Sequence, residues 1–429
     1  MQMTLIMFIT FFVLVFLSVP IGWALGISAV FSMVVTGCSS FNLILLASRI
    51  FNASNSFTLL ALPFFILAGN IMSRGGLSKR LINFCRSIVG SVRGGLGMTG
   101  IFAAFFFSAI SGSNSATTAS VGGMMIPELE NNGYPRELSA ATIASAGTTG
   151  MVVPPSTPMV VYAAASSASL PALFSGGLIP GIMMSISMMV CTYFIAKRMN
   201  IQKDSWKGFK NIGKTFVRAI GALMMPIIIL GGIYSGIFTA TEAAVVACVY
   251  ALIYTLASRE LKIKELPKIF WDSAITSAVG IIVITCASML SYVLTKEHVP
   301  ETIAKMFVSW TDSKLLILVL INIVLLIAGC FLTPSCAIVI LTPIFLPICV
   351  NYGVNPVCFG IIMIVNLALG SLTPPVGGNV FIASSIAKTP VEKIFARVGP
   401  YFIALLIDLT LLNLFDDIIL FLPRLMGQI

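Results

Sequence analysis

Charged residues are scarce in this sequence. Only 9% of its 429 residues are Asp, Glu, Lys or Arg, whereas 58% are hydrophobic and the mean hydropathy is +1.03. A water-soluble domain of this size needs far more polar residues to cover its surface. No stretch is long and polar enough to form a soluble domain. The composition therefore predicts an all-α polytopic membrane protein.

Residues that carry enzyme or metal chemistry are also scarce. The single histidine, His298, cannot build a histidine metal site, and the nine cysteines include no CxxC pair. The cysteines are expected to be small buried apolar side chains. Neither HExxH nor GxSxG occurs, so an intramembrane enzyme has little support. The charge rings or repeated filter segment of a channel are missing too.

The N-terminal region has no charge before Arg49. It lacks a basic n-region and a clear small-residue cleavage site, so we expect one retained membrane span over residues 3–35 and no signal peptide. Pro20 and the Gly22-x-x-x-Gly26 pair predict a bend or a close helix contact in this span. A loop is expected from there to about residue 56.

A formal net charge of +10 is also typical of nucleic-acid-binding proteins, but here the basic residues lie in short segments between apolar runs. This is the positive-inside pattern of membrane proteins. Residues 74–93 contain five basic residues and no acidic one, with apolar residues that suit a helix lying in the membrane interface. Residues 197–218 are also strongly basic, and both segments are predicted on the cytoplasmic side.

One pattern occurs twice in the sequence: a run of small and hydroxyl-bearing residues is followed, further along the chain, by a run of Thr, Gly and Pro. The first copy joins Ser111–Thr118 to a Thr/Gly/Pro run ending in Pro154-Pro155, and the second joins Gly329–Ser335 to a run ending in Pro374-Pro375. The two Pro-Pro pairs lie 374 − 154 = 220 residues apart. In hydrocarbon such breaks are tolerated only where backbone is buried in protein or lines a wet cavity. Matching breaks in two halves point to a transport site.

Shifted by 220 residues, the basic segment 74–93 corresponds to 295–314, where acids and bases balance. This difference is expected if one unit is repeated upside down in the membrane. The predicted fold is thus an inverted-repeat, elevator-type transporter with two re-entrant hairpins and two broken helices. The chain is predicted to divide into an N-terminal scaffold span (1–56), a first repeat (57–196), a basic loop with a central two-helix scaffold insert (197–273), a second repeat (274–422) and a tail (423–429). The first repeat comprises arm 74–93, hairpin 95–127 and broken helix 138–165. The second comprises arm 295–314, hairpin 315–349, broken helix 356–386 and a last span over 401–422.

One motif is misleading. Residues 208–215 match the phosphate-binding pattern GxxxxGK[ST] letter for letter. That loop needs a preceding strand, a following helix and an α/β sheet. Here it lies in a loop of about 22 residues between spans, so we interpret it as a solvated basic loop attracted to anionic lipid.

Several stretches resemble the large membrane subunit of TRAP transporters, the tripartite ATP-independent periplasmic family, and together they cover nearly the whole chain. Besides the two Pro-Pro breaks, they are Leu62-Pro63-Phe64-Phe65-Ile66-Leu67-Ala68-Gly69-Asn70-Ile71-Met72, Arg93-Gly94-Gly95-Leu96, Gly112-Ser113-Asn114-Ser115-Ala116 and Thr239-Ala240-Thr241-Glu242-Ala243-Ala244.

The resemblance implies a DctM-like subunit in the bacterial inner membrane that imports an organic acid, of the C4-dicarboxylate or the sialic-acid type, by Na⁺-driven elevator transport. It implies two partners, a periplasmic substrate-binding protein and a small four-helix membrane subunit, the latter expected as a separate chain because none precedes Met1. No cofactor is expected beyond Na⁺ as coupling ion. A stand-alone Na⁺- or H⁺-coupled carrier of the same fold is the alternative. The hairpins and broken helices would form the moving domain, and the arms and remaining spans the scaffold.

Na⁺ is a hard cation that takes oxygen ligands, and unwound carbonyls with Ser, Thr and Asn side chains supply them without a buried carboxylate. Packing of small residues is the alternative explanation for the first tip, but packing does not require Asn114. The second site is poorer in polar side chains, with Pro334 where the first has Asn114. The predicted Na⁺ ligands are Ser111, Ser113, Asn114, Gly147, Thr148 and Gly150 at the first site and Gly329, Thr333, Ser335, Gly370, Thr373, Gly377 and Gly378 at the second.

The carboxylate of the substrate is predicted to lie between the tips, facing the N–H groups of half-helix N-termini. The predicted substrate-binding residues are Ser115, Thr117, Pro154, Pro155, Pro374 and Pro375. Two acids lie elsewhere. Glu242 either carries a coupling proton or, our preferred interpretation, caps a helix after Thr239. Asp408, in the last span, is expected to face protein or a wet cavity.

Overall fold

The computed structural model describes residues 2–37, 43–74, 76–201, 203–310 and 313–429, and all its regular elements are helical. The first half contains α1 (Gln2–Phe16), α2 (Ile21–Val35), α3 (Leu43–Ser54), η1 (Phe57–Leu60), α4 (Ala61–Arg74), α5 (Leu77–Val89), α6 (Gly95–Ser111), α7 (Asn114–Asn131), α8 (Arg136–Gly147), α9 (Thr149–Val152), α10 (Thr157–Ser166) and α11 (Leu170–Arg198).

The second half continues in the same way. It contains α12 (Phe209–Tyr234), α13 (Ala240–Ala257), η2 (Ile263–Glu265), α14 (Leu266–Lys296), α15 (Val299–Trp310), α16 (Lys314–Phe331), α17 (Pro334–Asn351), α18 (Pro356–Gly370), α19 (Gly378–Ala387), α20 (Val391–Leu414) and α21 (Asp417–Leu425). Within the described part of the chain, seven helices are long and apolar enough to cross a membrane. The predicted polytopic all-α class is confirmed.

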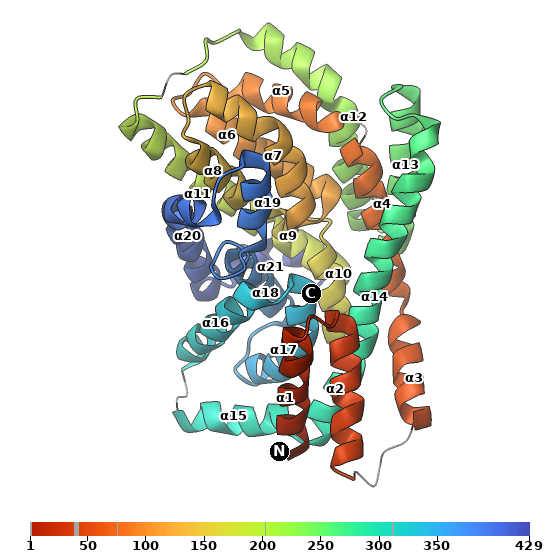
Figure 1. Ribbon diagram of the computed structural model, residues 1–429. Helices are drawn as coiled ribbons and strands as arrows, with labels where there is room; N and C mark the ends of the chain where they lie inside the picture. Colours follow the sequence, from red (N-terminus) through yellow and green to blue (C-terminus); the bar gives the residue numbers. More distant parts are fainter. Residues whose placement is uncertain (1, 38–42, 75, 202, 311–312) are drawn as a thin grey trace.

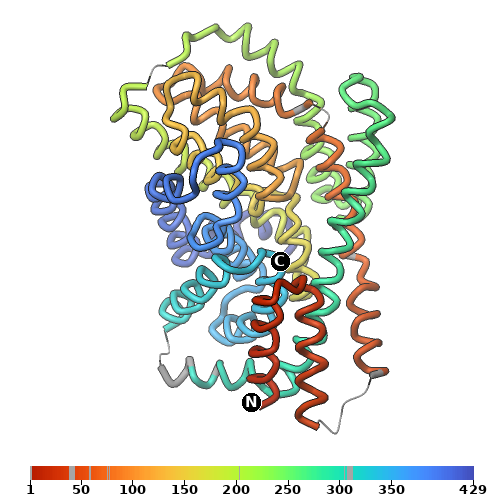
Figure 2. The backbone as a smooth tube through the Cα atoms, viewed as in Figure 1, coloured from red at the N-terminus to blue at the C-terminus, as the bar shows by residue number. Residues whose placement is uncertain are grey.

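The predicted single N-terminal span is wrong. Residues 2–35 form two helices of 15 residues, α1 and α2, which pack against each other on either side of a turn (Figures 1 and 2). Each is about 22 Å long. Ser18 in the turn has φ 62°, and Pro20 precedes α2. The following segment, expected as a loop, contains α3, which packs on α14.

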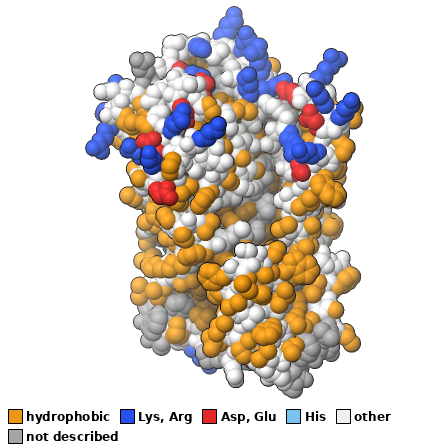
Figure 3. Space-filling model, viewed as in Figure 1, with side chains coloured by type: hydrophobic (Ala, Val, Ile, Leu, Met, Phe, Trp, Pro, Cys, Tyr) orange, Lys and Arg blue, Asp and Glu red, His pale blue; other side chains and the backbone are white. Residues whose placement is uncertain are grey.

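The two arms lie at opposite ends of the molecule. In Figure 1, α5 lies across the top and α15 across the bottom. The space-filling view shows Lys and Arg side chains gathered at the end that carries α5, while hydrophobic side chains dominate the other end of the face shown (Figure 3). This separation of charge matches the inverted arrangement of the two halves.

Each half contains a helical hairpin followed by an interrupted helix. In the first half, α6 and α7 meet at Gly112-Ser113, and α8, α9 and α10 are separated by breaks. Gly112 has φ 60°, a left-handed conformation that glycine adopts at no steric cost. In the second half, α16 and α17 meet at Leu332-Thr333, and residues 371–377 separate α18 from α19. The helix breaks therefore fall where the sequence predicts them.

The long helices α11 and α20, which were predicted to belong to the scaffold, pack on each other, with α11 against α6 of the first hairpin and α20 against α8 and α18 of the interrupted helices. The hydroxyl of Tyr401 on α20 lies 2.9 Å from the hydroxyl of Thr142 on α8 and 3.0 Å from that of Thr192 on α11. The last span also differs from the expected 401–422, because α20 starts at Val391 and ends at Leu414. The short α21 follows, and Gln428 of the predicted tail accepts a hydrogen bond from Ser175.

A second group of helices consists of α2, α4, α13 and α14, which pack on one another. The Asn70 amide on α4 donates to the Ser273 hydroxyl on α14 over 2.8 Å, and Arg74 pairs with Asp272 on the same helix at 2.6 Å. Cys248 on α13 donates its S–H to a carbonyl oxygen of α4. The hairpins, the interrupted helices, α11 and α20 form the other group, and the two groups are in direct contact, since α14 packs on α17 and α4 packs on α6.

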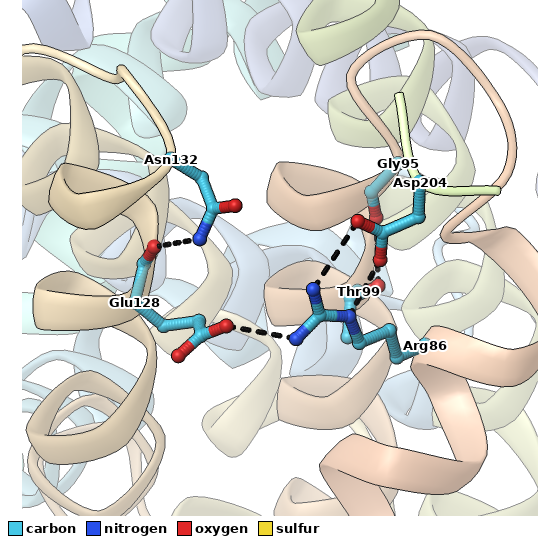
Figure 4. A network of polar contacts seen from close by, with 6 residues as sticks. All are labelled: Arg86, Gly95, Thr99, Glu128, Asn132 and Asp204. Carbon is cyan, nitrogen blue, oxygen red and sulfur yellow. Dashed lines mark hydrogen bonds and ion pairs between the residues drawn. The ribbon is translucent and has the colours of Figure 1, made fainter. Parts of the chain in front are cut away.

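Arg86 on the basic arm connects the arm to its surroundings. Its guanidinium lies between two carboxylates, Asp204 in the loop before α12 and Glu128 near the end of α7 (Figure 4). The nitrogen–oxygen distances are 2.6 and 3.2 Å to Asp204 and 2.8 Å to Glu128. The hydrogen bonds to Asp204 and then to Glu128 raise the pKa of Arg86. One side chain therefore links the arm, the first hairpin and the basic loop.

Candidate transport site

A cavity of about 700 Å³ lies where both hairpin tips and both breaks meet. Its lining comes from α4, α14, the two tips and the residues after each break. Eight predicted site residues line it: Ser111, Ser113, Asn114, Ser115, Gly329, Thr333, Ser335 and Gly378. The fold therefore brings together two stretches that are more than 200 residues apart in the sequence.

Four helix N-termini open onto this cavity. The first residues of α7 and α17 come from the hairpin tips, and those of α10 and α19 follow the two breaks; all four termini contribute lining residues. An N-terminus presents N–H groups without an intrahelical partner and the positive end of the helix dipole. None of the described residues that line the cavity carries a charged side chain. The cavity can therefore attract an anion through backbone groups alone.

Helix C-termini face the same space. The ends of α6 and α16 contribute Ser111 and Gly329-Cys330-Phe331, and Ser371 follows the end of α18. The last carbonyl groups of a helix lack intrahelical partners and carry partial negative charge. Such carbonyls, with hydroxyl oxygens, are the ligands expected for Na⁺ at discontinuous helices.

Short hydrogen bonds hold the first tip together. The hydroxyl groups of Ser111 and Thr117 are 2.9 Å apart, and the Ser111 hydroxyl lies 3.3 Å from the carbonyl oxygen of Ser113. The N–H of Thr157, at the start of α10, donates to the carbonyl oxygen of Gly112 over 3.0 Å. The tip and the first break are thus directly bonded. Thr117 is buried and stabilises the tip through its contact with the Ser111 hydroxyl, and it does not line the cavity.

Two glycines on the first broken helix let it approach this tip closely. A Cβ on Gly147 would lie 1.9 Å from the Thr118 hydroxyl oxygen, and one on Gly150 would lie 2.5 Å from the carbonyl oxygen of Ser113. Thr148 instead donates to the carbonyl of Ser145 within its own helix. These predicted ligands do not line the cavity. The two glycines provide the contact between α8–α9 and the tip.

The second tip and break meet in a similar way. A Cβ on Gly370 would lie 2.6 Å from the Cα of Gly329, so the two backbones touch. Thr373 donates to the carbonyl of Leu369, and Gly377 begins α19 with φ 47°. Neither residue lines the cavity, and nor does Gly370.

The four prolines predicted to contact substrate do not line the cavity. Both Pro-Pro bonds are cis. Pro154 and Pro155 are buried, whereas Pro374 and Pro375 are exposed. The prolines terminate helices at the breaks, while neighbouring residues such as Thr157 and Pro158 face the cavity.

Sequence reasoning missed several polar residues of the cavity, chiefly Asn379, Asn70 and Ser371. Asn379 is fully buried; its amide donates to the carbonyl oxygen of Ala144 on α8 over 3.2 Å. Its side-chain oxygen is buried and has no donor among the described residues. An asparagine one residue after Gly378, at the start of the helix that follows the second break, was the available signal.

The two acids outside the cavity have clear partners. Glu242 forms a capping box with Thr239: its carboxylate accepts from the Thr239 N–H over 2.8 Å, and its own N–H donates to the Thr239 hydroxyl over 3.3 Å. The predicted capping role is confirmed. Asp408 is buried between α20 and α11 and accepts a hydrogen bond from Ser187 over 2.5 Å. It therefore faces protein.

Known proteins resemble this chain over nearly its whole length. The family profile described as "Tripartite ATP-independent periplasmic transporter, DctM component" matches residues 8–418. The isethionate TRAP transporter permease protein DctMQ of Oleidesulfovibrio alaskensis is 41% identical over 92% of this chain, which spans 62% of that protein's length. The C4-dicarboxylate large permease DctM of Pseudomonas aeruginosa is 38% identical, with 89% of this chain and 90% of that protein covered.

Two further similarities are informative. The sialic acid TRAP large permease SiaM of Vibrio cholerae is 34% identical, with 96% of both chains covered. Among solved structures, the YdaH transporter of Alcanivorax borkumensis, described as having an unusual topology, superimposes with a TM-score of 0.63 at 15% identity. That match covers 86% of this chain and 87% of the other, and it supports the fold alone.

Proposed function

The chain belongs to the DctM family of tripartite ATP-independent periplasmic transporters, and on that basis we propose that it imports an organic acid coupled to Na⁺. It is a multi-pass inner-membrane protein, a transporter permease and not an enzyme. The observation that carries the proposal is the uncharged cavity at which four helix N-termini and three helix C-termini meet.

An organic acid fits the N-terminal ends of the four helices. Free N–H groups and aligned dipoles favour a carboxylate or sulfonate without a cationic side chain. The similar permeases are named for isethionate, C4-dicarboxylates and sialic acid, which are all organic acids. A cavity of about 700 Å³ has room for any of them. We therefore propose the class and test its members side by side.

Na⁺ fits the oxygen atoms around the tips. The first tip offers the Ser111 and Ser113 hydroxyls and the Asn114 side chain beside the C-terminal carbonyls of α6. Asn379 belongs to the lining of the same cavity, and its buried side-chain oxygen has no donor among the described residues. Oxygen ligands of this kind suit a hard cation, and a bound cation would bring the two hairpin tips into position for the anion.

An elevator movement is supported by the division into two groups of helices. We propose that both hairpins, which would re-enter the membrane from opposite sides, and both broken helices move together with α11 and α20. The group α2, α4, α13 and α14, with the arms α5 and α15, would stay at a fixed depth. The cavity lies between the groups, because Asn70 on α4 and Thr276 on α14 contribute to its lining.

Two partners complete the proposal. The family name implies a three-part system, so we expect a periplasmic binding protein that delivers the acid and a small membrane subunit beside this chain. A stand-alone carrier of the same fold, without a binding protein, is the second candidate.

Uptake into proteoliposomes separates the two candidates. We would reconstitute the chain with the small subunit and offer radiolabelled isethionate, a C4-dicarboxylate or sialic acid, with and without the cognate binding protein. We expect uptake of one of these acids only with the binding protein. Uptake of the free acid without it would favour the stand-alone carrier, and failure of all three acids would contradict the substrate class.

A further inference from the structure

A second cavity of about 700 Å³ lies at the basic end of the molecule. It is separate from the transport site and is bounded by the arm α5, the loop before α12, the first turns of α12 and the segment after α13. Fifteen residues line it, and five of them are cations: Lys79, Arg80, Arg86, Lys207 and Arg218. Hydroxyl and amide groups fill much of the remaining lining.

The charges in this cavity do not cancel. Five cations face two carboxylates, Asp204 and Glu260, which leaves a net charge of 5 − 2 = +3. Arg86 is paired with Asp204 and Glu128, and Arg80 is paired with Glu260. The other three cations, Lys79, Lys207 and Arg218, have no carboxylate partner in the part of the chain that the structure describes, and all three are exposed.

Hydrogen bonds join the elements that line the cavity. The hydroxyl groups of Ser87 on α5 and Thr215 on α12 are 2.8 Å apart, which ties the two helices together at the floor. The N–H of Asp204 donates to the carbonyl of Gly90 over 3.2 Å and fixes the loop against the end of the arm. The cavity is therefore built from α5, α12 and the loop before α12, which are hydrogen-bonded to one another and line it with cations and hydroxyl groups.

Two aromatic rings lie at the rim of the cavity, and exposed apolar side chains run along the side of α12 that faces away from it. Trp206 lines the cavity and is 50% exposed, and its ring packs edge-on against Phe209, which is 82% exposed. Val217 and Ile220 lie further along the same helix and are also exposed. Tryptophan beside a band of exposed apolar side chains is typical of the membrane–water interface. The rim of the basic cavity thus carries an aromatic pair suited to the interface, and the same helix presents an apolar side to acyl chains.

We propose that this cavity binds the phosphate group of an anionic phospholipid, with Lys79, Lys207 and Arg218 as its cationic ligands. The phosphate chemistry is shared with free inorganic phosphate, but the apolar side of α12 favours a lipid. A bound lipid ties α5 and α12 to the headgroup layer, which would hold the arm at a fixed depth while other parts move.

The phosphate-loop pattern over residues 208–215 does not account for this site. No strand precedes Gly208 among the described residues, and residues 209–215 are the first turns of α12. Lys214, the lysine of that pattern, does not line the cavity, whereas Lys207 and Arg218 on either side of it do. Nucleotide binding through that pattern is therefore not the basis of the proposal.

Binding of short-chain lipids to the purified full-length chain tests the site. Native mass spectrometry would count adducts with phosphatidylglycerol, with phosphatidylcholine and with sodium phosphate. The test variant is Lys79→Gln/Lys207→Gln/Arg218→Gln. The matched control, Lys203→Gln/Lys210→Gln/Lys214→Gln, removes the same charge from exposed residues of the basic segment that do not line the cavity. Equal melting temperatures would show that both variants are folded.

We expect the wild-type chain and the control to prefer phosphatidylglycerol over phosphatidylcholine, and the test variant to bind phosphatidylglycerol about tenfold more weakly or worse. Equal loss in both variants would reduce the effect to general surface charge and overturn the site. A wild-type chain without any preference would overturn it as well. Tight binding of sodium phosphate that displaces phosphatidylglycerol would assign the site to the free ion and overturn the lipid.

Discussion

At the scale of single residues, the two tips of the transport cavity differ in chemistry. Asn114 begins α7 at the first tip, and Pro334 begins α17 at the equivalent place in the second. An asparagine side chain offers an oxygen ligand, whereas proline offers neither a side-chain oxygen nor an N–H. The first tip should therefore contribute more side-chain oxygen to a cation than the second.

We predict that Asn114→Ala raises the Na⁺ concentration for half-maximal uptake about tenfold, equivalent to about 1.4 kcal/mol of binding free energy. The loss of one oxygen ligand is the physical reason. The measurement is substrate uptake against external Na⁺. Asn132→Ala is the control, because Asn132 lies at the far end of the same hairpin and bonds only to the Glu128 carbonyl. An unchanged Na⁺ dependence in Asn114→Ala would remove this residue from the site.

Glu242 gives a prediction of the opposite kind. Its carboxylate closes a capping box at the start of α13 and lies outside the transport cavity. We expect Glu242→Gln to lower the thermal stability slightly and to leave the Na⁺ and pH dependence of uptake unchanged, because a cap stabilises its helix without joining the transport cycle. Parallel melting and uptake curves measure this. A shifted pH profile of uptake would restore the coupling role to Glu242.

At the scale of elements, backbone contact between each hairpin tip and its broken helix organises the site. Gly370 on α18 touches Gly329 on α16, and Gly150 on α9 touches the first tip. These contacts leave no room for a Cβ. The cavity therefore depends on glycine at the helix breaks as much as on the polar side chains.

Gly370→Ala should abolish or strongly reduce uptake. Its new methyl group would lie 2.6 Å from the Gly329 Cα, and relief of that overlap would separate the second tip from its broken helix. Overpacking of this kind costs about 1–3 kcal/mol. Gly399→Ala serves as the control, since a Cβ there meets no atom within 4 Å. Initial uptake rates at equal expression measure the effect, and normal uptake by Gly370→Ala would mean that the contact is not needed.

The elements with strong local signals could be predicted from the sequence. Gly, Thr and Pro clusters around Pro154 and Pro374 located both breaks, and the composition of 74–93 located an amphipathic helix, α5. The turn between α1 and α2 could not be found in this way, because residues 17–19 are Leu, Ser and Val and carry no charge. Only Pro20 marked it, and a proline also suits a kink in one continuous span.

Within the site, the sequence identified the polar residues of the first hairpin tip but not the residues of α4 and α19 that line the cavity beside it. Ser111, Ser113 and Asn114 stood out because polar residues are costly in an apolar hairpin. Asn70 and Asn379 reach the cavity only through the tertiary packing of α4 and α19 on the tips, which a local pattern does not contain. The four prolines predicted to contact substrate end helices at the breaks and do not line the cavity.

At the scale of the whole molecule, movement of the hairpin group past the scaffold is the main prediction. A bifunctional thiol reagent that bridges Arg86→Cys and Glu128→Cys would join the arm to the first hairpin. The same reagent on Arg74→Cys and Asp272→Cys would join α4 to α14 within the proposed scaffold. Both pairs replace an ion pair, at 2.8 and 2.6 Å. The nine native cysteines would first be replaced by serine.

We expect bridging of the arm–hairpin pair to stop uptake and bridging of the scaffold pair to leave uptake intact. Cleavage of the bridge with a reducing agent that splits its disulfide bonds should restore transport. If uptake continues with the arm and hairpin bridged, the first hairpin does not move relative to the arm, and the proposed division of the molecule is wrong.

The most direct test of the account is the driving ion. Proteoliposomes that contain the chain and its small subunit would receive the radiolabelled acid, with the binding protein present, and either an inward Na⁺ gradient or K⁺ at the same membrane potential. The account predicts accumulation of the acid above its external concentration with Na⁺ and only slow equilibration with K⁺. Equal accumulation in both conditions would contradict the proposed ion site at the hairpin tips.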